Sequence, residues 1–213
     1  MRGRFITIEG SEGAGKSTAQ SFIAEKLEAQ GLLVVCTREP GGTPLAEAIR
    51  HTLLSLEIEA PVELAELLLV FAARAQHLAK VIEPALAQGK WVICDRFTDA
   101  TFAYQGSARG LPYETIAMLE RLVQGDQRPD AVVLMDLAPE LGMKRARARG
   151  DLDRFEREDQ AFYDRVRAGY LSRAEMNAAR YRIVDASQSL EGVQRDLSEL
   201  IGQWINDDRS GRY

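Results

Sequence analysis

Several features on which proteins build special sites are scarce in this 213-residue chain. It has two cysteines, Cys36 and Cys94, and two histidines, His51 and His77. Because the thiols lack metal-ligand spacing, the chain predicts neither a disulfide framework nor a structural zinc site, and it favours a reducing compartment. It has no run of about 18 apolar residues, and its N-terminus lacks the apolar region of a secretory signal. We therefore expect no membrane span and a cytoplasmic location.

Positive charge is also in deficit. Lys and Arg number 27 against 32 Asp and Glu, which gives a formal net charge of −5. A general nucleic-acid binder needs a basic surface, so we expect no nucleic-acid partner. Local positive charge for a small phosphorylated ligand remains compatible with this balance.

What the chain does contain is a regular alternation of strand-like and helix-like segments. Hydrophobic residues make up 46% of it, enough for a full core in one α/β domain over residues 1–213. This alternation predicts a parallel sheet with helices on both faces and functional loops at the carboxyl ends of the strands. The expected strands are 4–9, 32–37, 91–94, 131–136 and 181–185. The expected helices are 18–30, a segment capped by Thr43 that carries Leu45, Ile49 and Leu53, 62–86 with an interruption at Pro84, 139–150, 160–179 and 190–205, before a frayed tail at 206–213.

A phosphate-binding loop follows the first expected strand. Residues 10–18 fit the pattern G-x-x-x-x-G-K-S/T, in the order Gly10, Ser11, Glu12, Gly13, Ala14, Gly15, Lys16, Ser17 and Thr18. Glycines let the backbone wrap around a polyphosphate, and consecutive N–H groups with the helix N-terminus supply positive potential. Lys16 adds a full charge, and the Ser17 hydroxyl suits Mg²⁺. We therefore expect binding of a nucleoside triphosphate.

Arginine-bearing segments follow two later strands. Arg38 comes after the second expected strand, and Arg96 comes after the third, beside Asp95. Parallel topology places both at the sheet edge that holds the phosphate loop, and a planar guanidinium suits a second phosphate. The alternatives are local ion pairs, of Arg38 with Glu39 and of Arg96 with Asp95. Two phosphate sites facing each other predict phosphoryl transfer between two phosphorylated molecules.

A third cluster of arginines surrounds Gly150. Its members are Arg145, Arg147, Arg149 and Arg154. A glycine-interrupted, charge-dense segment at about 144–157 is typical of a lid that folds over a site and retracts. The alternative is a solvated helix face, which is the usual fate of a run of charges.

In these segments the chain resembles the bacterial thymidylate kinases, of the P-loop nucleoside monophosphate kinase type. The resemblance rests on Glu12 and on residues 38–43, 95–97, 103–106 and 147–154, and it spans about 5–204. It implies a five-stranded parallel sheet sandwiched by helices, with a small lid. It also implies transfer of the γ-phosphoryl group of ATP to dTMP, which gives dTDP, with Mg²⁺ as cofactor, and a homodimer.

The resemblance also implies a role for individual residues. Lys16, Arg96 and the lid arginines Arg149 and Arg154 would act on the transferred phosphoryl group, and Ser17 and Asp95 would lie at the metal. Asp136, which ends another apolar strand, is a rival carboxylate for the metal. The expected contacts of dTMP are Arg38 and Arg96 for its phosphate, Glu12 for its 3′-hydroxyl, Tyr104 for its sugar, and Phe71, Arg74, Thr101 and Gln105 for its base.

The position of the base-stacking ring departs from the family pattern. That family usually has Phe four residues before the arginine at the thymine edge, whereas Val70 stands four residues before Arg74 and Phe71 stands three before it. One residue is about 100° of helical rotation, so Phe71 is either the stacking ring or an ordinary core aromatic.

Three other functions compete with dTMP phosphorylation. The nearest is a P-loop kinase of a different nucleoside monophosphate. A switch GTPase needs an N-K-x-D sequence, but neither Asn177 nor Asn206 precedes a lysine. A non-catalytic nucleotide-binding subunit would not need an arginine-rich lid. The apolar stretch 64–78 is a candidate dimer surface, or else a helix buried within its own domain.

Overall fold

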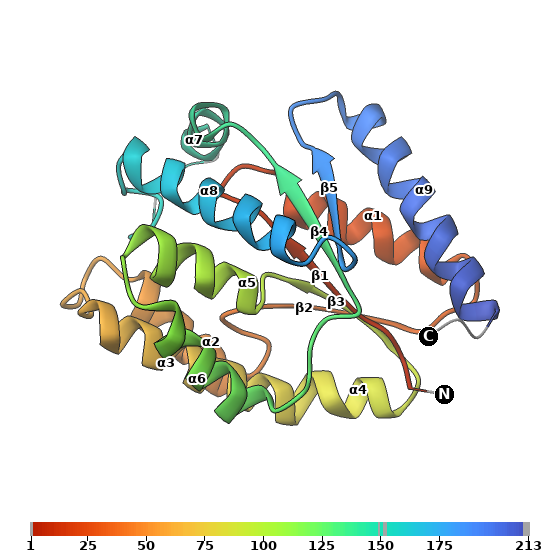
Figure 1. Ribbon diagram of the computed structural model, residues 1–213, viewed down its shortest axis with the longest axis horizontal. Coiled ribbons are helices and arrows are strands. Elements are labelled where there is room, and N and C mark those ends of the chain that lie inside the picture. The colour runs from red at the N-terminus through yellow and green to blue at the C-terminus, as the bar shows by residue number, and fades with distance from the viewer. Residues whose placement is uncertain (1, 149, 151–152, 211–213) are drawn as a thin grey trace.

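Five parallel strands form one sheet in the computed structural model, which describes residues 2–148, 150 and 153–210 (Figure 1). The strand order is β2-β3-β1-β4-β5, which confirms the expected five-stranded parallel sheet. The strands are β1 (Phe5–Glu9), β2 (Val34–Arg38), β3 (Trp91–Asp95), β4 (Ala131–Asp136) and β5 (Tyr181–Asp185). β1 is therefore the central strand, and the loop that follows it lies in the middle of the sheet edge formed by the carboxyl ends of the strands.

Helices cover both faces of this sheet (Figure 1). They are α1 (Lys16–Glu28), α2 (Pro44–Leu54), α3 (Glu63–His77), α4 (Glu83–Ala87), α5 (Thr98–Thr101), α6 (Tyr113–Gln124), α7 (Pro139–Arg147), α8 (Gln160–Met176) and α9 (Leu190–Arg209), with π-helical segments η1 (Leu78–Ile82) and η2 (Phe102–Ala108). Side chains alternate along β1, so Ile6 and Ile8 pack against α1 and α9, whereas Phe5 packs against η1 and α4. By the same alternation Glu9 lies on the face opposite α1.

Two expected helix boundaries need correction. The segment 62–86 is not interrupted at Pro84, because Pro84 lies in the first turn of α4, where a missing N–H is tolerated. The irregularity is instead the π-helical η1, just before it. The last helix continues to Arg209 rather than fraying at 206, and Asp208 pairs with Arg4 at 3.3 Å.

The region between β3 and β4 contains helices that are not among those expected from the sequence. α5 and η2 follow β3 directly, and α6 lies between Pro112 and Gly125. Proline before a helix and glycine after it are ordinary start and stop signals, so α6 had a signal in the sequence. A π-helical segment has no such signal, because its spacing differs from the 3.6-residue period.

Candidate active site

The phosphate-binding loop is already shaped around its lysine. The Lys16 ammonium group donates a hydrogen bond to the Ser11 carbonyl at 2.9 Å, and only 7% of the residue is exposed. Burial lowers the pKa of Lys16, as does Arg96, while Glu12 and Asp95 act in the opposite direction. A Cβ on Gly13, which has φ of 72°, would lie 2.2 Å from the Gly142 carbonyl oxygen. Glycine is therefore required there by both space and backbone conformation.

A hydroxyl and a carboxylate meet at the start of α1. The Ser17 hydroxyl donates to Asp95 Oδ2 at 3.3 Å, while Asp95 Oδ1 is buried without a partner among the described residues. Two hard oxygen ligands beside a phosphate loop fit Mg²⁺, which retains several waters and takes few protein ligands. The rival carboxylate, Asp136, has both oxygens bound by Arg167 at 2.8 Å. The geometry therefore favours Asp95 over Asp136.

Arg96 is held rigidly although its backbone is strained. Its φ is 68°, the one positive value at a non-glycine residue within the described part of the chain. Its backbone N–H donates to the Ile8 carbonyl at 2.9 Å, and the next N–H, of Phe97, donates to Glu9 at 2.8 Å. The guanidinium donates to the Gly10 carbonyl at 3.0 Å and also to the Glu12 carboxylate. These contacts fix the direction in which Arg96 enters the site.

Two tyrosines complete the surroundings of Arg96. The Tyr104 ring lies 4.9 Å below the guanidinium carbon, and its hydroxyl donates to Glu12 at 3.3 Å. Tyr170 accepts from Arg96 Nη1 at 3.2 Å and donates to Glu9 Oε2 at 3.0 Å. Burial, together with Asp99, raises the pKa of Glu9 to about 8, although Arg96 and the two hydrogen bonds oppose this shift. Glu9 is therefore a buried carboxyl group that Tyr170 links to Arg96, and its pKa lies slightly above neutral pH.

One cavity of about 530 Å³ joins most of the expected site residues. One wall is the phosphate loop, with Glu12, Lys16 and Ser17, and Asp95 and Arg96 lie beside it. The remaining lining residues of interest are Arg38, Arg50, Val70, Arg74, Phe97, Thr101, Tyr104 and Gln105. The structure thus brings the two expected phosphate-binding regions into a single space.

A third arginine, Arg50, was missed from the sequence. It lines the cavity, donates to the Pro40 carbonyl at 3.1 Å, and lies near Arg38. Burial lowers the pKa of Arg50, and the positive charges of Arg38 and Arg96 lower it further, a field that favours an anion. The available signal was helical spacing: Arg50 lies four residues after Ala46 and three before Leu53, both of which are buried, so the three share one side of α2.

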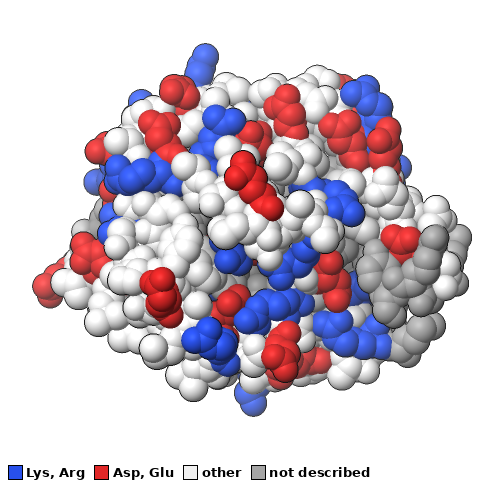
Figure 2. Space-filling model, viewed as in Figure 1, with Lys and Arg blue, Asp and Glu red and all other residues white. Residues whose placement is uncertain are grey.

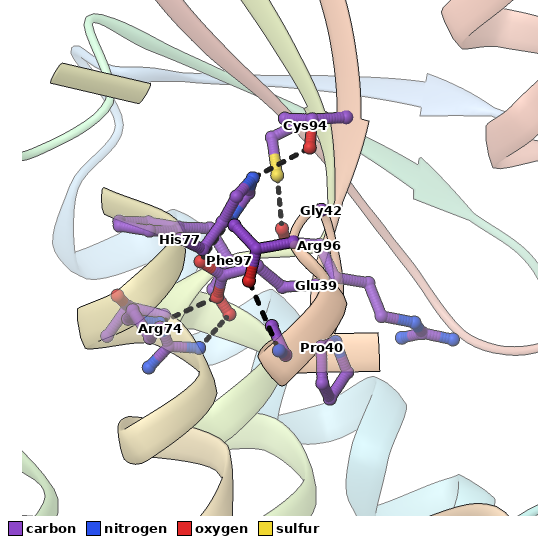
Figure 3. A network of polar contacts seen from close by, with 12 residues as sticks. Glu39, Pro40, Gly42, Arg74, His77, Cys94, Arg96 and Phe97 are labelled. Atoms are coloured by element: carbon purple, nitrogen blue, oxygen red, sulfur yellow. Dashed lines mark hydrogen bonds and ion pairs between the residues drawn. The ribbon is translucent and has the colours of Figure 1, made fainter. Parts of the chain in front are cut away.

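Arg74 lines the cavity and is almost completely buried, and Figure 3 shows its guanidinium beside Glu39. Its Nε donates to Glu39 at 2.7 Å, and its Nη2 donates to the Phe97 carbonyl at 3.1 Å and to the Thr101 hydroxyl at 2.9 Å. Its Nη1 is buried without a partner among the described residues. A buried donor of this kind fits a ligand acceptor atom.

The structure does not bring Phe71 to this cavity. Phe71 is buried with Leu67, Phe102 and Ile116 in the core beneath α3, and its ring contacts the guanidinium of Arg74 at 4.8 Å. Val70 lines the cavity instead, because one helical residue turns the side chain by about 100°. The expectation that Phe71 stacks on a base is therefore corrected in favour of the core-aromatic alternative.

The two lid arginines expected to act on the phosphoryl group have different outcomes. Arg149 lies outside the described residues. Arg154 does not line the cavity: it pairs with the buried Glu66 at 2.6 Å and donates to the Leu53 carbonyl at 2.7 Å. In this structure Arg154 therefore anchors the segment to α2 and α3.

Arg145 lies between the main cavity and a second one of about 210 Å³. It donates to the Ala186 carbonyl at 3.0 Å. The second cavity is bounded by the phosphate loop, by Arg145 and by the start of α9, with Gln188 at its rim. Its lining is largely apolar, as a planar ring requires. The sequence predicts a place in the lid for Arg145 and gives no signal for this cavity.

The exposed charges do not form a field of one sign on the face in view. Figure 2 shows Lys and Arg interspersed with Asp and Glu there.

Within residues 2–148, 150 and 153–210, no helix is long and apolar enough to cross a membrane. No cluster of three or more His, Cys, Asp or Glu suited to a metal occurs in that same part of the chain. Any metal at Asp95 and Ser17 would therefore take its remaining ligands from the bound nucleotide and from water.

Comparisons with known proteins agree with this geometry. The family model described as thymidylate kinase matches residues 8–197. The chain is 60% identical over 205 residues to a thymidylate kinase of Pseudomonas syringae pv. tomato, covering 96% of this chain and 98% of the relative. It is 57% identical to one of Teredinibacter turnerae, covering 96% and 100%. A crystal structure of thymidylate kinase from Ehrlichia chaffeensis superposes with a TM-score of 0.76 at 35% identity, covering 94% and 99%. The chain belongs to the thymidylate kinase family.

Proposed function

We propose that the main cavity is the acceptor and transfer site of an ATP-dependent nucleoside monophosphate kinase that converts dTMP to dTDP. One observation carries the proposal: the phosphate loop and three arginines, Arg38, Arg50 and Arg96, line the same cavity. A site for one polyphosphate needs only the loop, whereas the arginines supply a second anion site. The shared space allows direct transfer between the two bound nucleotides.

The acceptor nucleotide lies along the arginine side of the cavity. Arg38, Arg50 and Arg96 bind its phosphate, and Glu12 accepts a hydrogen bond from the sugar 3′-hydroxyl. Tyr104, held by Glu12 and stacked under Arg96, forms the wall against the sugar.

The base of the acceptor lies at Arg74. Thr101, Gln105, Val70 and Phe97 are the other lining residues at that end. The unpartnered Nη1 of Arg74 donates to an acceptor on the base edge, which favours the O4 of thymine over the amino group of cytosine. This contact supports dTMP over the alternative of a cytidine monophosphate.

The donor nucleotide lies on the phosphate loop. Lys16 and the loop N–H groups bind the β- and γ-phosphates, and the second cavity holds the base of ATP. Arg145 lies where the donor base and phosphates join. The lid expected at about 144–157 includes Arg145, and Arg154 holds this segment against α2 and α3.

Ser17 and Asp95 hold Mg²⁺ in this proposal. The unpartnered Asp95 Oδ1 and the Ser17 hydroxyl are the oxygens that fit the ion. When bound, Mg²⁺ neutralises charge on the phosphates of ATP. The residues of the chain then position both nucleotides and stabilise the charge that spreads over the transferred group.

An assay of ADP formation tests the acceptor assignment. ADP released from ATP and Mg²⁺ is followed by coupled oxidation of NADH, with dTMP, dUMP, dCMP, dGMP or no acceptor. We expect rapid ADP formation with dTMP and a much lower kcat/KM with dCMP. Equal rates with and without an acceptor, or a preference for dCMP, would contradict the proposal.

A homodimer is proposed on a separate observation. Large apolar side chains are exposed on two neighbouring helices, Leu64 and Leu68 on α3 and Met118 and Leu122 on α6. An apolar face of this kind fits a self-complementary contact between two copies. Light scattering during gel filtration should give twice the chain mass, and Leu68→Glu should lower it to one chain. A wild-type monomer at micromolar concentration would contradict the proposal.

A further inference from the structure

His77 is the last residue of α3 and is completely buried. It does not line either cavity. Its Nδ1 lies 3.0 Å from Glu39 Oε1 (Figure 3). Its Nε2 lies 2.7 Å from the Thr37 hydroxyl. Since a carboxylate oxygen only accepts, Nδ1 carries the proton in the first contact. In the neutral ring the Thr37 hydroxyl then donates to Nε2.

Glu39 connects this histidine to Arg74. One carboxylate oxygen accepts from His77, and the other accepts from Arg74 Nε at 2.7 Å. Both Glu39 and Arg74 are at most 4% exposed, so the carboxylate depends on these two donors. Its orientation therefore sets the angle of the Arg74 guanidinium together with the Phe97 carbonyl and the Thr101 hydroxyl.

That angle decides which donor of Arg74 is left for a ligand. With Nε on Glu39 and Nη2 on Phe97 and Thr101, Nη1 is the nitrogen that finds no partner in the described part of the chain. A rotated guanidinium would point a different N–H into the cavity, or none. Selectivity at the base edge therefore depends on groups that never touch the base.

His77 also supports the loop that follows Arg38 at the end of β2. A Cβ on Gly42 would lie 2.5 Å from the imidazole ring, so the loop packs directly on His77. Pro40, which lines the cavity, lies within this loop. One buried ring thus contacts both the base-side arginine, through Glu39, and the loop on the phosphate side.

We propose that His77 is a positioning residue for acceptor selectivity, acting through Glu39 on Arg74. The inference rests on the proposed assignment of Arg74 to the acceptor base. It predicts that the hydrogen bond from Nδ1 matters for selectivity and that the contact of Nε2 does not. A residue with a merely structural role would affect stability through either contact.

Two amide substitutions separate the contacts. In His77→Asn the amide nitrogen replaces Nδ1 and retains the bond to Glu39. In His77→Gln the amide group reaches the position of Nε2 and retains only the bond to Thr37. Thr37→Val removes the hydroxyl and leaves Glu39 untouched, so it is a matched control for the Nε2 contact.

Steady-state kinetics with dTMP and dCMP measure the effect. For His77→Gln we expect KM for dTMP to rise about 10-fold, as for loss of a hydrogen bond to a charged group, and kcat to change much less. As KM for dTMP rises, the ratio of kcat/KM for dTMP to kcat/KM for dCMP should fall. KM for ATP should stay constant. His77→Asn and Thr37→Val should keep a selectivity close to that of the wild type.

Three results would overturn the inference while the wild type still shows dTMP-dependent ADP formation. They are wild-type selectivity in His77→Gln, equal losses in the Asn and Gln variants, or a KM for ATP that rises together with that for dTMP. Should His77→Gln not fold, Glu39→Gln provides the same measurement, since it weakens the ion pair with Arg74 at nearly constant volume. Unchanged selectivity in Glu39→Gln would also overturn the inference. Absence of dTMP-dependent ADP formation in the wild type would instead refute the proposed function.

Discussion

Glu9→Gln should remove a pH dependence of folding stability that this one buried carboxyl group creates. Glu9 is fully buried at the end of the central strand, and its pKa rises from an ordinary 4.5 to about 8. Between these two values the native state holds a proton that the unfolded chain has lost. Unfolding then releases a proton, so the free energy of unfolding falls as the pH rises through this window.

The magnitude follows from the size of the shift. A rise from 4.5 to about 8 corresponds to about 5 kcal/mol between the acid and alkaline limits. Between pH 6 and pH 9 the linkage relation gives a loss of about 2 to 3 kcal/mol attributable to Glu9. Gln retains an acceptor for the Phe97 N–H and does not titrate. The variant should therefore gain stability relative to the wild type by this amount as the pH rises.

Urea denaturation at pH 6, 7, 8 and 9 measures the effect. Other titrating groups are shared by both proteins, so the difference in free energy of unfolding isolates Glu9. Glu175→Gln, at an exposed position on α8, changes the formal charge equally and should give a constant difference. If the difference for Glu9→Gln were also constant between pH 6 and pH 9, Glu9 would be ionised throughout and the reasoning would fail.

Three further single substitutions and one double substitution test the transfer site and the Arg154–Glu66 contact. Lys16→Ala should lower kcat by about 10³-fold, as for other preorganised charges on a transferred group, with an unchanged circular dichroism spectrum; retention of most activity would remove Lys16 from the mechanism. Arg96→Ala should raise KM for dTMP and lower kcat with little change in the Kd of ATP measured by calorimetry, and the reverse pattern would exchange the two phosphate sites. Arg154→Ala should lower kcat with small effects on both dissociation constants, and adding Glu66→Gln should bring little further loss; additive losses would show that the two residues act separately.

The sheet and the phosphate loop were predictable because local patterns determine them. The apolar strands 131–136 and 181–185 have the expected bounds, and the Thr43 hydroxyl caps α2 through the Ala46 N–H at 3.1 Å. Gly15 and Lys16 follow the first strand as the motif requires. In these cases the determining contacts lie within a few residues of each other.

The remaining site residues depend on how distant elements dock. Arg50 lies on the same side of α2 as the buried Ala46 and Leu53, but it reaches the cavity only through the packing of α2 on α3, which the sequence does not indicate. Arg154 pairs with Glu66, which is 88 residues away, so a charge pattern within the lid could not reveal it. Val70 and Phe71 are both apolar, and which of them faces the cavity depends on the rotation of α3.

The π-helical segments η1 and η2 have a consequence for how relatives of different length are aligned. A π-helical turn holds an additional residue within an otherwise continuous helix. When a relative that lacks the turn is aligned with this chain, a one-residue gap within 78–82 or 102–108 would keep equivalent side chains paired before and after the gap. An alignment without that gap would misplace every later side chain of the helix by about 100°. Deletion of one residue there is therefore expected to convert the π-helical turn into an α-helical one without shortening a loop. The stability that is lost should depend on which core side chains are rotated.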